Sequence, residues 1–491
     1  MVSGRSHVQI TTEIGTGGDP SGTRSPTGWA VLSDEIVEFN MDSLGSSALS
    51  VNWRHARQGG IAGSLRPGQR LGRGRAVPCR ETGSRWYGGA ALATAPVGRQ
   101  HLRAEQAITW AFQWTTSWEE AWTPAFVDRW EALVRDSPTA HVFFHPAPVR
   151  AWVESVGRIL DLEPRFLVAR SDTGSTVFLP LVSARTGWKD LWWRMLGPVG
   201  YMGFDYRDPV LDGPDTRVLW SSFWPAFEDE LLHRWGGTFD ACSIRGIRRR
   251  CLPADVAWSG RHEVEVGPSR PINGYVAPCA DLSGTRSIDE FLRQRSPNLR
   301  GDLGRRLRRM EELGRVTFHV YGPDDIEGAR GAVEAMLQQH ARRWPMKWTL
   351  RPYYDALVDR CMPAGLLHLS ELRIGGSAVS WHLGFVHRDR FYYYVPAFRA
   401  DYGACSPGKV HLRMCVADAI DRGLATFDFL CGDEPYKVQW CDGQTEVFGM
   451  SWASAGALSR ARTGWAVRVK PSLAWLRRRL RNQLKALRPG R

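Results

Sequence analysis

Residues 391–440 read FYYYVPAFRADYGACSPGKVHLRMCVADAIDRGLATFDFLCGDEPYKVQW and predict a strand, a loop, a helix and a second strand in that order. The aromatic run Phe391–Val395 is typical of a strand, and an apolar helix is expected over about 407–422. A second strand is expected at 427–430, followed by a polar turn at 432–437. This order of elements sets the start of a helix beside the ends of two strands.

The loop before that helix has the residues of an anion site. Ser406 is a good N-cap, and Pro407 fits the first turn of a helix. Gly408 allows another group to approach the backbone, and Lys409 adds a positive charge. The first amides of a helix lack intrahelical partners and favour phosphate groups. The alternative is a capped core helix that binds nothing.

Composition limits the class of protein. The chain has 491 residues, a length that suggests two or three domains, and a net charge of +13. Residues 460–491 contain eleven Lys or Arg and no acid, and residues 1–105 carry a net +4, which leaves −2 for residues 106–459. A nearly neutral centre gives no reason to expect nucleic acid as a partner of the folded core.

Nine cysteines occur without a CxxC pair, so no metal site is expected. No stretch of 18 apolar residues occurs, so no membrane-spanning helix is expected. We expect a cytoplasmic protein. Peripheral association with the inner face of the membrane is a further expectation.

Four segments follow from the distribution of residue types. They are a disordered Gly/Arg/Ser-rich region at 1–112, a first α/β unit at 113–275, a second unit at 276–457 and a basic amphipathic tail at 458–491.

The two units have a similar order of elements. In the first, helices are expected at 124–135, 147–158 and 217–235, and strands at 165–170, 176–182 and 238–244. In the second, helices are expected after Ser287, up to Gly314 and at 324–342, and strands at 315–320, 366–374 and 378–387, the last two joined by Gly375-Gly376. The segment 191–212 is aromatic and rich in Gly and Pro.

Several runs in both units match a known pattern. The second unit has His340-Ala341-Arg342-Arg343-Trp344, a hairpin, a tyrosine-rich strand, the Ser-Pro-Gly-Lys loop and Asp428-Phe429-Leu430-Cys431-Gly432-Asp433-Glu434-Pro435-Tyr436-Lys437. The first unit has Phe144-His145-Pro146, Trp152, Leu179-Pro180-Leu181 and Asp205-Tyr206-Arg207-Asp208-Pro209. Over about 115–455 the chain resembles GNAT-superfamily acetyltransferases of the CelD/BcsL, or BioF2-like, group. FemAB-like transferases are similar in fold.

The resemblance implies an α/β fold with a mixed sheet, made of two tandem GNAT-like halves. It also implies acyl transfer from acetyl-CoA or another acyl-CoA to an amine, such as a sugar amine or a precursor of a cell-surface polysaccharide. The pyrophosphate of the donor would meet Ser406, Pro407, Gly408 and Lys409. Its pantetheine arm would lie between 391–395 and 427–430, next to Tyr394 and Val395.

The same resemblance gives the polar turn its catalytic candidates. Glu434 or Asp433 would accept the proton of the amine or orient it, and Tyr436 would protonate the leaving thiolate. Lys437 would hold a phosphate or the developing oxyanion. The alternatives are a solvated turn for Asp433 and Glu434, and a packed aromatic side chain for Tyr436.

Further candidates lie elsewhere. Asp205, Tyr206 and Arg207 lie in a Gly-rich loop and are candidates for binding the acceptor. His382 is a second acceptor candidate, although a core histidine is the alternative. The arginine face of the helix at 300–309 is either a solvated surface or a site for phosphate or a sugar acid.

The tail places Leu473, Leu476, Leu480, Leu484 and Leu487 on one helical face and arginines elsewhere. This pattern fits either an anionic membrane surface or a helix docked on its own domain. For the whole chain, two alternatives to an acyl-CoA-dependent enzyme remain open. One is a FemAB-like enzyme that uses aminoacyl-tRNA, and the other is a non-catalytic GNAT-like module that docks at the membrane.

Overall fold

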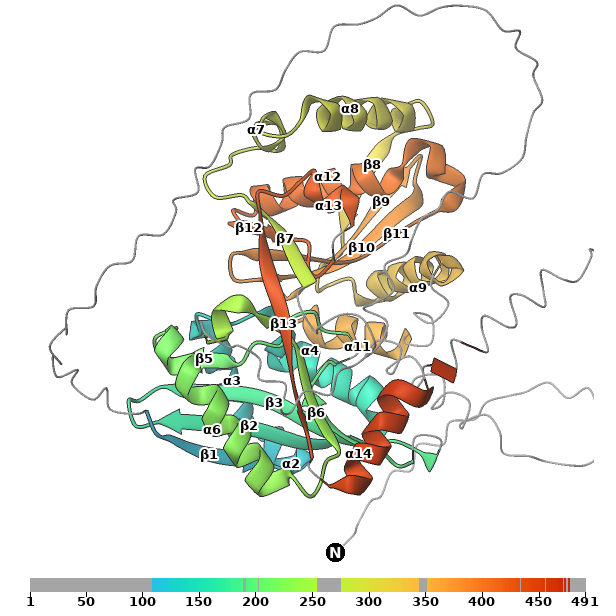
Figure 1. Ribbon diagram of the computed structural model, residues 1–491. Helices are drawn as coiled ribbons and strands as arrows, with labels where there is room; N and C mark the ends of the chain where they lie inside the picture. The colour runs from blue at the N-terminus through green and yellow to red at the C-terminus, as the bar shows by residue number, and fades with distance from the viewer. Residues whose placement is uncertain are drawn as a thin grey trace, which may run out of the picture.

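A computed structural model of the chain describes residues 108–188, 191–201, 203–253, 275–343, 351–432, 434–454, 456–470, 472–473 and 476 (Figure 1). The predicted disorder of residues 1–112 therefore lies almost wholly outside the described residues. Strand β1 (Trp110–Thr115) begins inside the segment that the sequence assigned to disorder.

The N-terminal half forms one end of a single large mixed sheet. Its strands are β1, β2 (Glu163–Ser171), β3 (Thr176–Arg185), β4 (Arg194–Pro198), β5 (Val210–Asp212) and β6 (Ala241–Arg248). The first four main strands pair antiparallel in the order β1-β2-β3-β4, and β6 then pairs with β4 in parallel. Short β5 pairs with β3, off the main path.

The C-terminal half repeats this arrangement at the other end. Its strands are β7 (Tyr275–Asp281), β8 (Val316–Val320), β9 (Leu367–Ile374), β10 (Ser377–His387), β11 (Arg390–Phe398), β12 (Thr426–Asp428) and β13 (Gly443–Ala453). Strands β8 to β11 pair antiparallel in order, and β12 pairs with β11 in parallel. Each half therefore has four antiparallel strands followed by one parallel strand.

One long strand, β13, joins the two halves within the sheet (Figure 1). Its first part, 443–447, pairs with β7, and its second part, 447–453, pairs with β6. Strand β7 in turn pairs with β12. Val447 is the one residue of β13 that has a partner on both sides, Tyr275 and Arg248.

Helices cover both faces of the sheet. In the N-terminal half they are α2 (Trp118–Ala121), α3 (Pro124–Asp136), α4 (Pro146–Trp152), α5 (Arg158–Leu160) and α6 (Arg217–Trp235). In the C-terminal half they are α7 (Ile288–Arg293), α8 (Pro297–Glu311), α9 (Ile326–Arg343), α11 (Arg351–Cys361), α12 (Pro407–Asp421) and α13 (Pro435–Val438). Helix α14 (Ala457–Gly464) follows β13 and contacts the N-terminal half. Helix α8 lies on the outer side of α12, and α11 packs on α4 between the halves (Figure 1).

The core is continuous across the boundary between the halves. Phe143 of the N-terminal half contacts Phe204 and Tyr206 of its own half, and also Tyr392 and Tyr394 of β11. These rings are buried or nearly so and belong to one apolar cluster. Burial of aromatic side chains on this scale is a main source of stabilisation, so the two halves stabilise each other.

Local signals placed most of the long elements correctly. The hairpin at Gly375-Gly376 forms with φ of 56° and 85°, as a type I′ turn requires. The Ser287 side chain caps α7 as predicted. Local patterns did not predict β4 and β5 inside the segment 191–212, nor β7, β13 and α11.

Candidate functional site

The Ser406-Pro407-Gly408-Lys409 loop does start helix α12, but Ser406 is not a side-chain cap. Ser406 has φ 49° and ψ 61°, and its hydroxyl makes no capping hydrogen bond to the helix. That prediction was wrong, because the left-handed backbone of Ser406 directs its side chain elsewhere. The hydroxyl accepts a hydrogen bond from Arg306 of α8 instead. Pro407 occupies the first turn as predicted, and a Cβ on Gly408 would contact the Phe398 ring at 3.4 Å.

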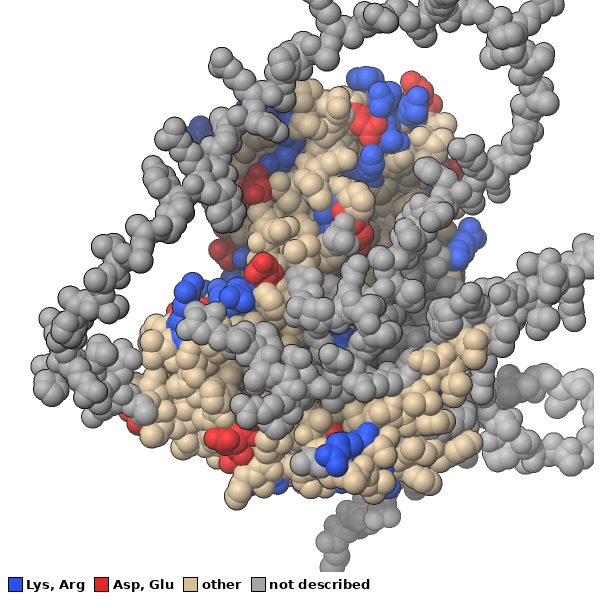
Figure 2. Space-filling view, viewed as in Figure 1, with Lys and Arg blue, Asp and Glu red and all other residues tan. Residues whose placement is uncertain are grey.

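Cations from two helices converge beside this loop. Arg305, Arg306 and Lys409 all donate to the Asp302 carboxylate, at 2.8, 2.8 and 3.0 Å. The hydrogen bond from Arg306, followed by those from Lys409 and Arg305, lowers the pKa of Asp302 well below its ordinary value. Three cations share one carboxylate, so the cluster carries a net positive charge. Figure 2 shows blue and red side chains mixed over α8.

Strands β11 and β12 separate next to the loop. Their last parallel pair is Tyr392 with Asp428, after which β11 continues to Phe398. The chain after β12 stays with β7 instead, because the amide of Phe429 donates to Pro278 O. The edge of β11 beyond Tyr392 is therefore no longer paired with β12, as expected of a groove for an extended donor.

The two side chains predicted to line that groove are engaged elsewhere. The Tyr394 hydroxyl donates to Gly203 O at 2.6 Å, and Val395 is buried in the shared core.

Lys437 stabilises the polar turn after β12 through an ion pair and two hydrogen bonds. Its ammonium lies 2.8 Å from Glu434 Oε2 and donates to Cys431 O at 3.2 Å and Leu430 O at 3.4 Å. Lys437 is only 4% exposed. Leu430 and Gly432 have φ of 58° and 133°, so the backbone of this turn is unusual and needs support.

The other candidates of the turn have different surroundings. Glu434 is exposed apart from its ion pair with Lys437, which leaves one face of its carboxylate accessible. Tyr436 packs against the apolar cluster under α12, and burial raises its pKa. Asp433 lies outside the described residues.

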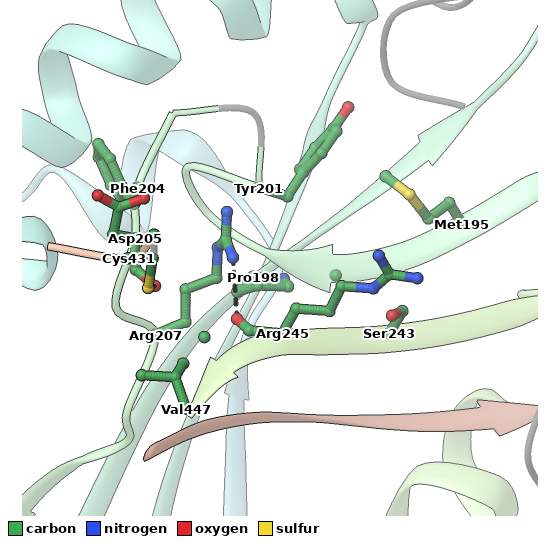
Figure 3. Close-up of a pocket in the computed structure, with 13 residues that line it drawn as sticks. Met195, Pro198, Tyr201, Phe204, Asp205, Arg207, Ser243, Arg245, Cys431 and Val447 are labelled. Atoms are coloured by element: carbon green, nitrogen blue, oxygen red, sulfur yellow. Dashed lines mark hydrogen bonds between the residues drawn. The ribbon is translucent and has the colours of Figure 1, made fainter. Parts of the chain in front are cut away.

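A pocket of about 330 Å³ lies between β4 and β6 of the N-terminal half (Figure 3). These strands pair in parallel only at Met195 with Ala241 and Leu196 with Cys242, and then separate. The C-terminal half closes the pocket with the turn after β12. The walls comprise Met195, Gly197, Pro198, Tyr201, Phe204, Asp205, Arg207, Ser243, Arg245, Gly246, Cys431, Gly432 and Val447.

The candidate catalytic turn after β12 contacts this pocket through Gly432. A Cβ on Gly432 would lie 2.4 Å from Glu434 Oε2 and 3.0 Å from Lys437 Nζ. Gly432 itself lines the pocket. Asp205 and Arg207 from the N-terminal half and the 432–437 turn from the C-terminal half therefore meet at one place, as a two-substrate site would require.

Two arginines give the pocket its chemistry. Arg207 donates to Arg245 O at 2.9 Å and Gly200 O at 3.0 Å, and its Nε has no hydrogen-bond partner among the described residues. Burial lowers the pKa of Arg207 to about 10. Figure 3 shows Arg207 and Arg245 side by side, from the 200–208 loop and from β6. Asp205 lines the same pocket. The pocket wall therefore contains two cations and one carboxylate.

Tyr206 and His382 do not line the pocket. Tyr206 is on the opposite face of its loop, where its hydroxyl donates to Asp428. His382 is fully buried, and its ring stacks on Tyr393 at 4.3 Å. Neither nitrogen of His382 has a hydrogen-bond partner in the described part of the chain.

The sequence reasoning missed Arg245, which lines the pocket from β6. One signal was available, namely the glycine that follows it inside a strand, since such a glycine often marks a close backbone approach. Gly246 has φ 89°, and a Cβ there would lie 2.5 Å from Asp205 O. Gly246 is what lets the 200–208 loop approach β6.

Comparison with known proteins agrees with this arrangement. Residues 297–438 match the family described as an acetyltransferase (GNAT) domain. The matched stretch lies within the C-terminal half, which is therefore similar to a GNAT domain. The predicted fold class, a mixed α/β sheet with two tandem GNAT-like halves, is confirmed. Membership of the CelD/BcsL group stays a prediction.

The solved structures that the chain matches share little sequence with it. FemX is 13% identical, with a TM-score of 0.46 over 65% of this chain and 95% of that one. A conserved protein of unknown function from Bacteroides thetaiotaomicron is 11% identical, with a TM-score of 0.43 over 70% and 100%. A tandem GNAT protein from the clavulanic acid biosynthesis pathway is 10% identical, with a TM-score of 0.39 over 71% and 100%. No curated protein matches the chain.

Within the described residues, no helix has the length and apolar character needed to cross a bilayer. The same residues include no group of three His, Cys, Asp or Glu side chains that could hold a metal ion.

Proposed function

We propose that this protein is an N-acyltransferase that moves an acyl group from acyl-CoA to an amine. The C-terminal half binds the donor, and the pocket between β4 and β6 binds the acceptor. The convergence of Arg306 and Lys409 at the start of α12, inside a GNAT-type domain, is the observation that carries this proposal.

The donor site combines charge with an open strand edge. Acyl-CoA carries a pyrophosphate, which Arg305, Arg306 and Lys409 could bind together with the first amides of α12. Asp302 holds these cations in place before the donor arrives. The pantetheine arm is an extended amide chain, and the edge of β11 beyond Tyr392 offers it backbone hydrogen-bonding groups.

The acceptor site combines the pocket with the turn after β12. Arg207 and Arg245 favour an acceptor that carries a phosphate or carboxylate besides its amine. An amino sugar in a glycan precursor has this chemistry. Asp205 is placed to bind the amine while the arginines bind the anion.

The chemical step needs a neutral amine and a place for its proton. Glu434 lies next to Gly432, which lines the pocket, and is the proton acceptor in this proposal. Lys437 keeps the Glu434 carboxylate in position and supports the carbonyls of Leu430 and Cys431. Tyr436 is the candidate for protonating the leaving thiolate, since its raised pKa keeps the phenol protonated.

Calorimetry with acetyl-CoA on the full-length protein tests the donor site. We expect Arg306→Ala and Lys409→Ala each to weaken binding by about tenfold or more, as expected for loss of a charge-assisted hydrogen bond. Arg309→Ala is the matched control, because Arg309 is exposed on the same helix. Unchanged affinity in both site variants would refute the donor site.

A donor screen separates the competing activities. Thiol release from acetyl-CoA in the presence of amino sugars supports the proposal. Transfer from charged tRNA, without acetyl-CoA binding, would support the FemAB-like alternative. Binding of acetyl-CoA without thiol release from any amine would instead favour a module without catalytic activity.

A further inference from the structure

An apolar surface at the turn between β3 and β4 has no role in the proposed reaction. In this turn, Trp188 is 68% exposed, Leu191 40% and Trp192 49%. Large apolar side chains gathered in one exposed turn are unusual on a soluble surface and mark a site of interaction.

The backbone conformation of this turn is unfavourable for bulky apolar residues. Leu191 and Trp192 have φ of 55° and 51°, in the left-handed region. Asn and Gly are the residues that favour successive positive φ in a hairpin turn, and bulky residues are disfavoured there. Leu191 and Trp192 are unfavourable here both for their backbone and for their exposure, so folding alone does not account for them.

Trp193, which follows this turn, contacts the C-terminal segment. Trp193 Nε1 donates to Thr463 Oγ1 of α14 at 3.2 Å, and Trp193 packs in one cluster with Met195 and Ala466. Figure 1 shows α14 next to the far end of β3. The hairpin and the start of the tail are therefore parts of one surface.

The residues that the structure describes after α14 include exposed apolar side chains, and the sequence that follows them is basic. Val469, Leu473 and Leu476 are 44%, 41% and 45% exposed. From Lys470 to Arg491 the sequence contains eight Lys or Arg and no acid. Tryptophan prefers the interface between lipid headgroups and acyl chains, and clustered basic residues are attracted to anionic lipids.

We propose that the turn at Trp188, Leu191 and Trp192, together with the C-terminal segment from Val469 onward, docks the protein on an anionic bilayer. The basic tail supplies the charge complementarity, and the turn supplies side chains that insert among the headgroups. This surface is independent of the donor and acceptor assignments.

The acceptor pocket lies next to the surface that docks on the bilayer. Met195 and Tyr201, which line the pocket, contact the same cluster that holds α14 to the hairpin. A protein docked by this turn holds its pocket close to the headgroups. Acceptors carried on a membrane lipid would then reach the pocket without release into solution.

Vesicle flotation of the full-length protein tests the proposal. Vesicles of phosphatidylcholine with about one third phosphatidylglycerol are compared with pure phosphatidylcholine. We expect binding to the anionic vesicles, with weaker binding to neutral ones and at high salt. The double variant Trp188→Ser/Trp192→Ser should weaken partitioning by about tenfold, as expected for loss of interfacial insertion.

A matched control distinguishes this surface from general hydrophobicity. Leu313 and Val438 are 59% and 68% exposed on the C-terminal half, away from the hairpin. The variant Leu313→Ser/Val438→Ser should bind vesicles like the wild type. Equal binding of the Trp188→Ser/Trp192→Ser variant and the wild type would overturn the proposal, as would no binding of the wild type.

Two additional measurements make the result decisive. Acetyl-CoA affinity should be the same in all variants, which shows that they fold and separates this test from that of the donor site. Sedimentation velocity should show the same mass for wild type and Trp188→Ser/Trp192→Ser. A wild-type dimer that this variant abolishes would show that a second copy covers the surface, and would refute the bilayer as its partner.

Discussion

The hydroxyl of Tyr206, in the N-terminal half, donates to both carboxylate oxygens of Asp428, in the C-terminal half, at 2.8 and 3.0 Å. Arg390 also binds Asp428, at 3.0 Å, and the guanidinium of Arg248 lies 4.8 Å from the centre of the Tyr206 ring. A buried network therefore connects the acceptor loop to the end of β12.

Removing the Tyr206 hydroxyl should destabilise the whole protein. Tyr206→Phe leaves a buried carboxylate with one partner fewer, and we expect the free energy of unfolding to fall by about 1.5–3 kcal/mol. Urea denaturation measures the change. Tyr436→Phe is the control, since Tyr436 packs against an apolar cluster within the C-terminal half, and the change should affect stability little. Equal effects of the two variants would contradict a linking role for Tyr206.

Lys437 should be important for stability as well as for turnover. The Lys437 ammonium is buried and donates to the carbonyls of Leu430 and Cys431. We expect Lys437→Ala to lower the free energy of unfolding by about 1–3 kcal/mol, because those carbonyls lose a buried donor. Thermal melting and turnover are measured on the same samples.

Glu434→Gln separates the two roles. The exposed amide should leave the melting temperature nearly unchanged, and turnover should fall by about tenfold or more if Glu434 accepts the proton. Wild-type turnover in Glu434→Gln would remove the proton acceptor from the mechanism.

Buried histidines should make the protein sensitive to acid. His368, His382 and His411 lie between β9, β10 and α12, and burial lowers the pKa of each, that of His411 to about 3. A histidine in the unfolded chain has a pKa of about 6.5, so below this pH the unfolded chain binds more protons than the folded one. The free energy of unfolding should therefore decrease as the pH falls from about 6.5 towards 3.

Denaturation in urea at pH 7.5, 5.5 and 4.5 measures this dependence. The groups around the cluster are Ser370, Ser380, Tyr393, Cys415 and Asp418, of which Asp418 has a lowered pKa through its contacts with His368 and Arg422 and adds to the same trend. His411→Gln should reduce the slope below pH 6 by up to about 1.4 kcal/mol per pH unit, the equivalent of one proton. An unchanged slope would exclude His411 from the acid response.

Gly246→Ala should damage the pocket specifically. The new Cβ would lie 2.5 Å from Asp205 O and 3.1 Å from Arg207 Nη1, so the 200–208 loop would have to move. Gly174→Ala is a matched control, because Gly174 has nearly the same φ, 88° against 89°, with nothing within 4 Å of its Cβ.

Gly174→Ala should cost about 1–2 kcal/mol through its left-handed backbone alone. Gly246→Ala should cost more and should raise the KM for the acceptor while leaving acetyl-CoA affinity unchanged. Equal stability losses and equal KM values in the two variants would show that the loop does not depend on this contact.

Elements with strong local signals could be predicted from the sequence. Helix α6 was predicted at its observed bounds, because its apolar residues and its N-cap at Thr216 are both local features. The strands β7 and β13 were missed because their partners lie far away in the sequence, and pairing decides their structure. In particular, β13 pairs with one half through its first residues and with the other through its last, which no local pattern shows.

The candidate site was predictable only where the residue type and its neighbours in the sequence indicate the role. Asp205 and Arg207 were chosen for their residue types in a Gly-rich loop, and both line the pocket. Ser406 was assigned as a cap from its residue type, but its side chain turned to Arg306, which is a hundred residues away in the sequence. His382 was placed near the substrate because it is a histidine on a strand, whereas burial decides its position.

The course of β13 has a mechanical consequence. In the part of the sheet that the structure describes, this strand joins the two halves, and its change of partner occurs at Val447, on the pocket wall. Because Val447 lines the pocket, we expect a tilt of one half against the other to alter the width of the cavity. Filling the cavity should in turn set the angle between the halves, so that small-angle scattering could detect acceptor binding as a change of overall dimensions.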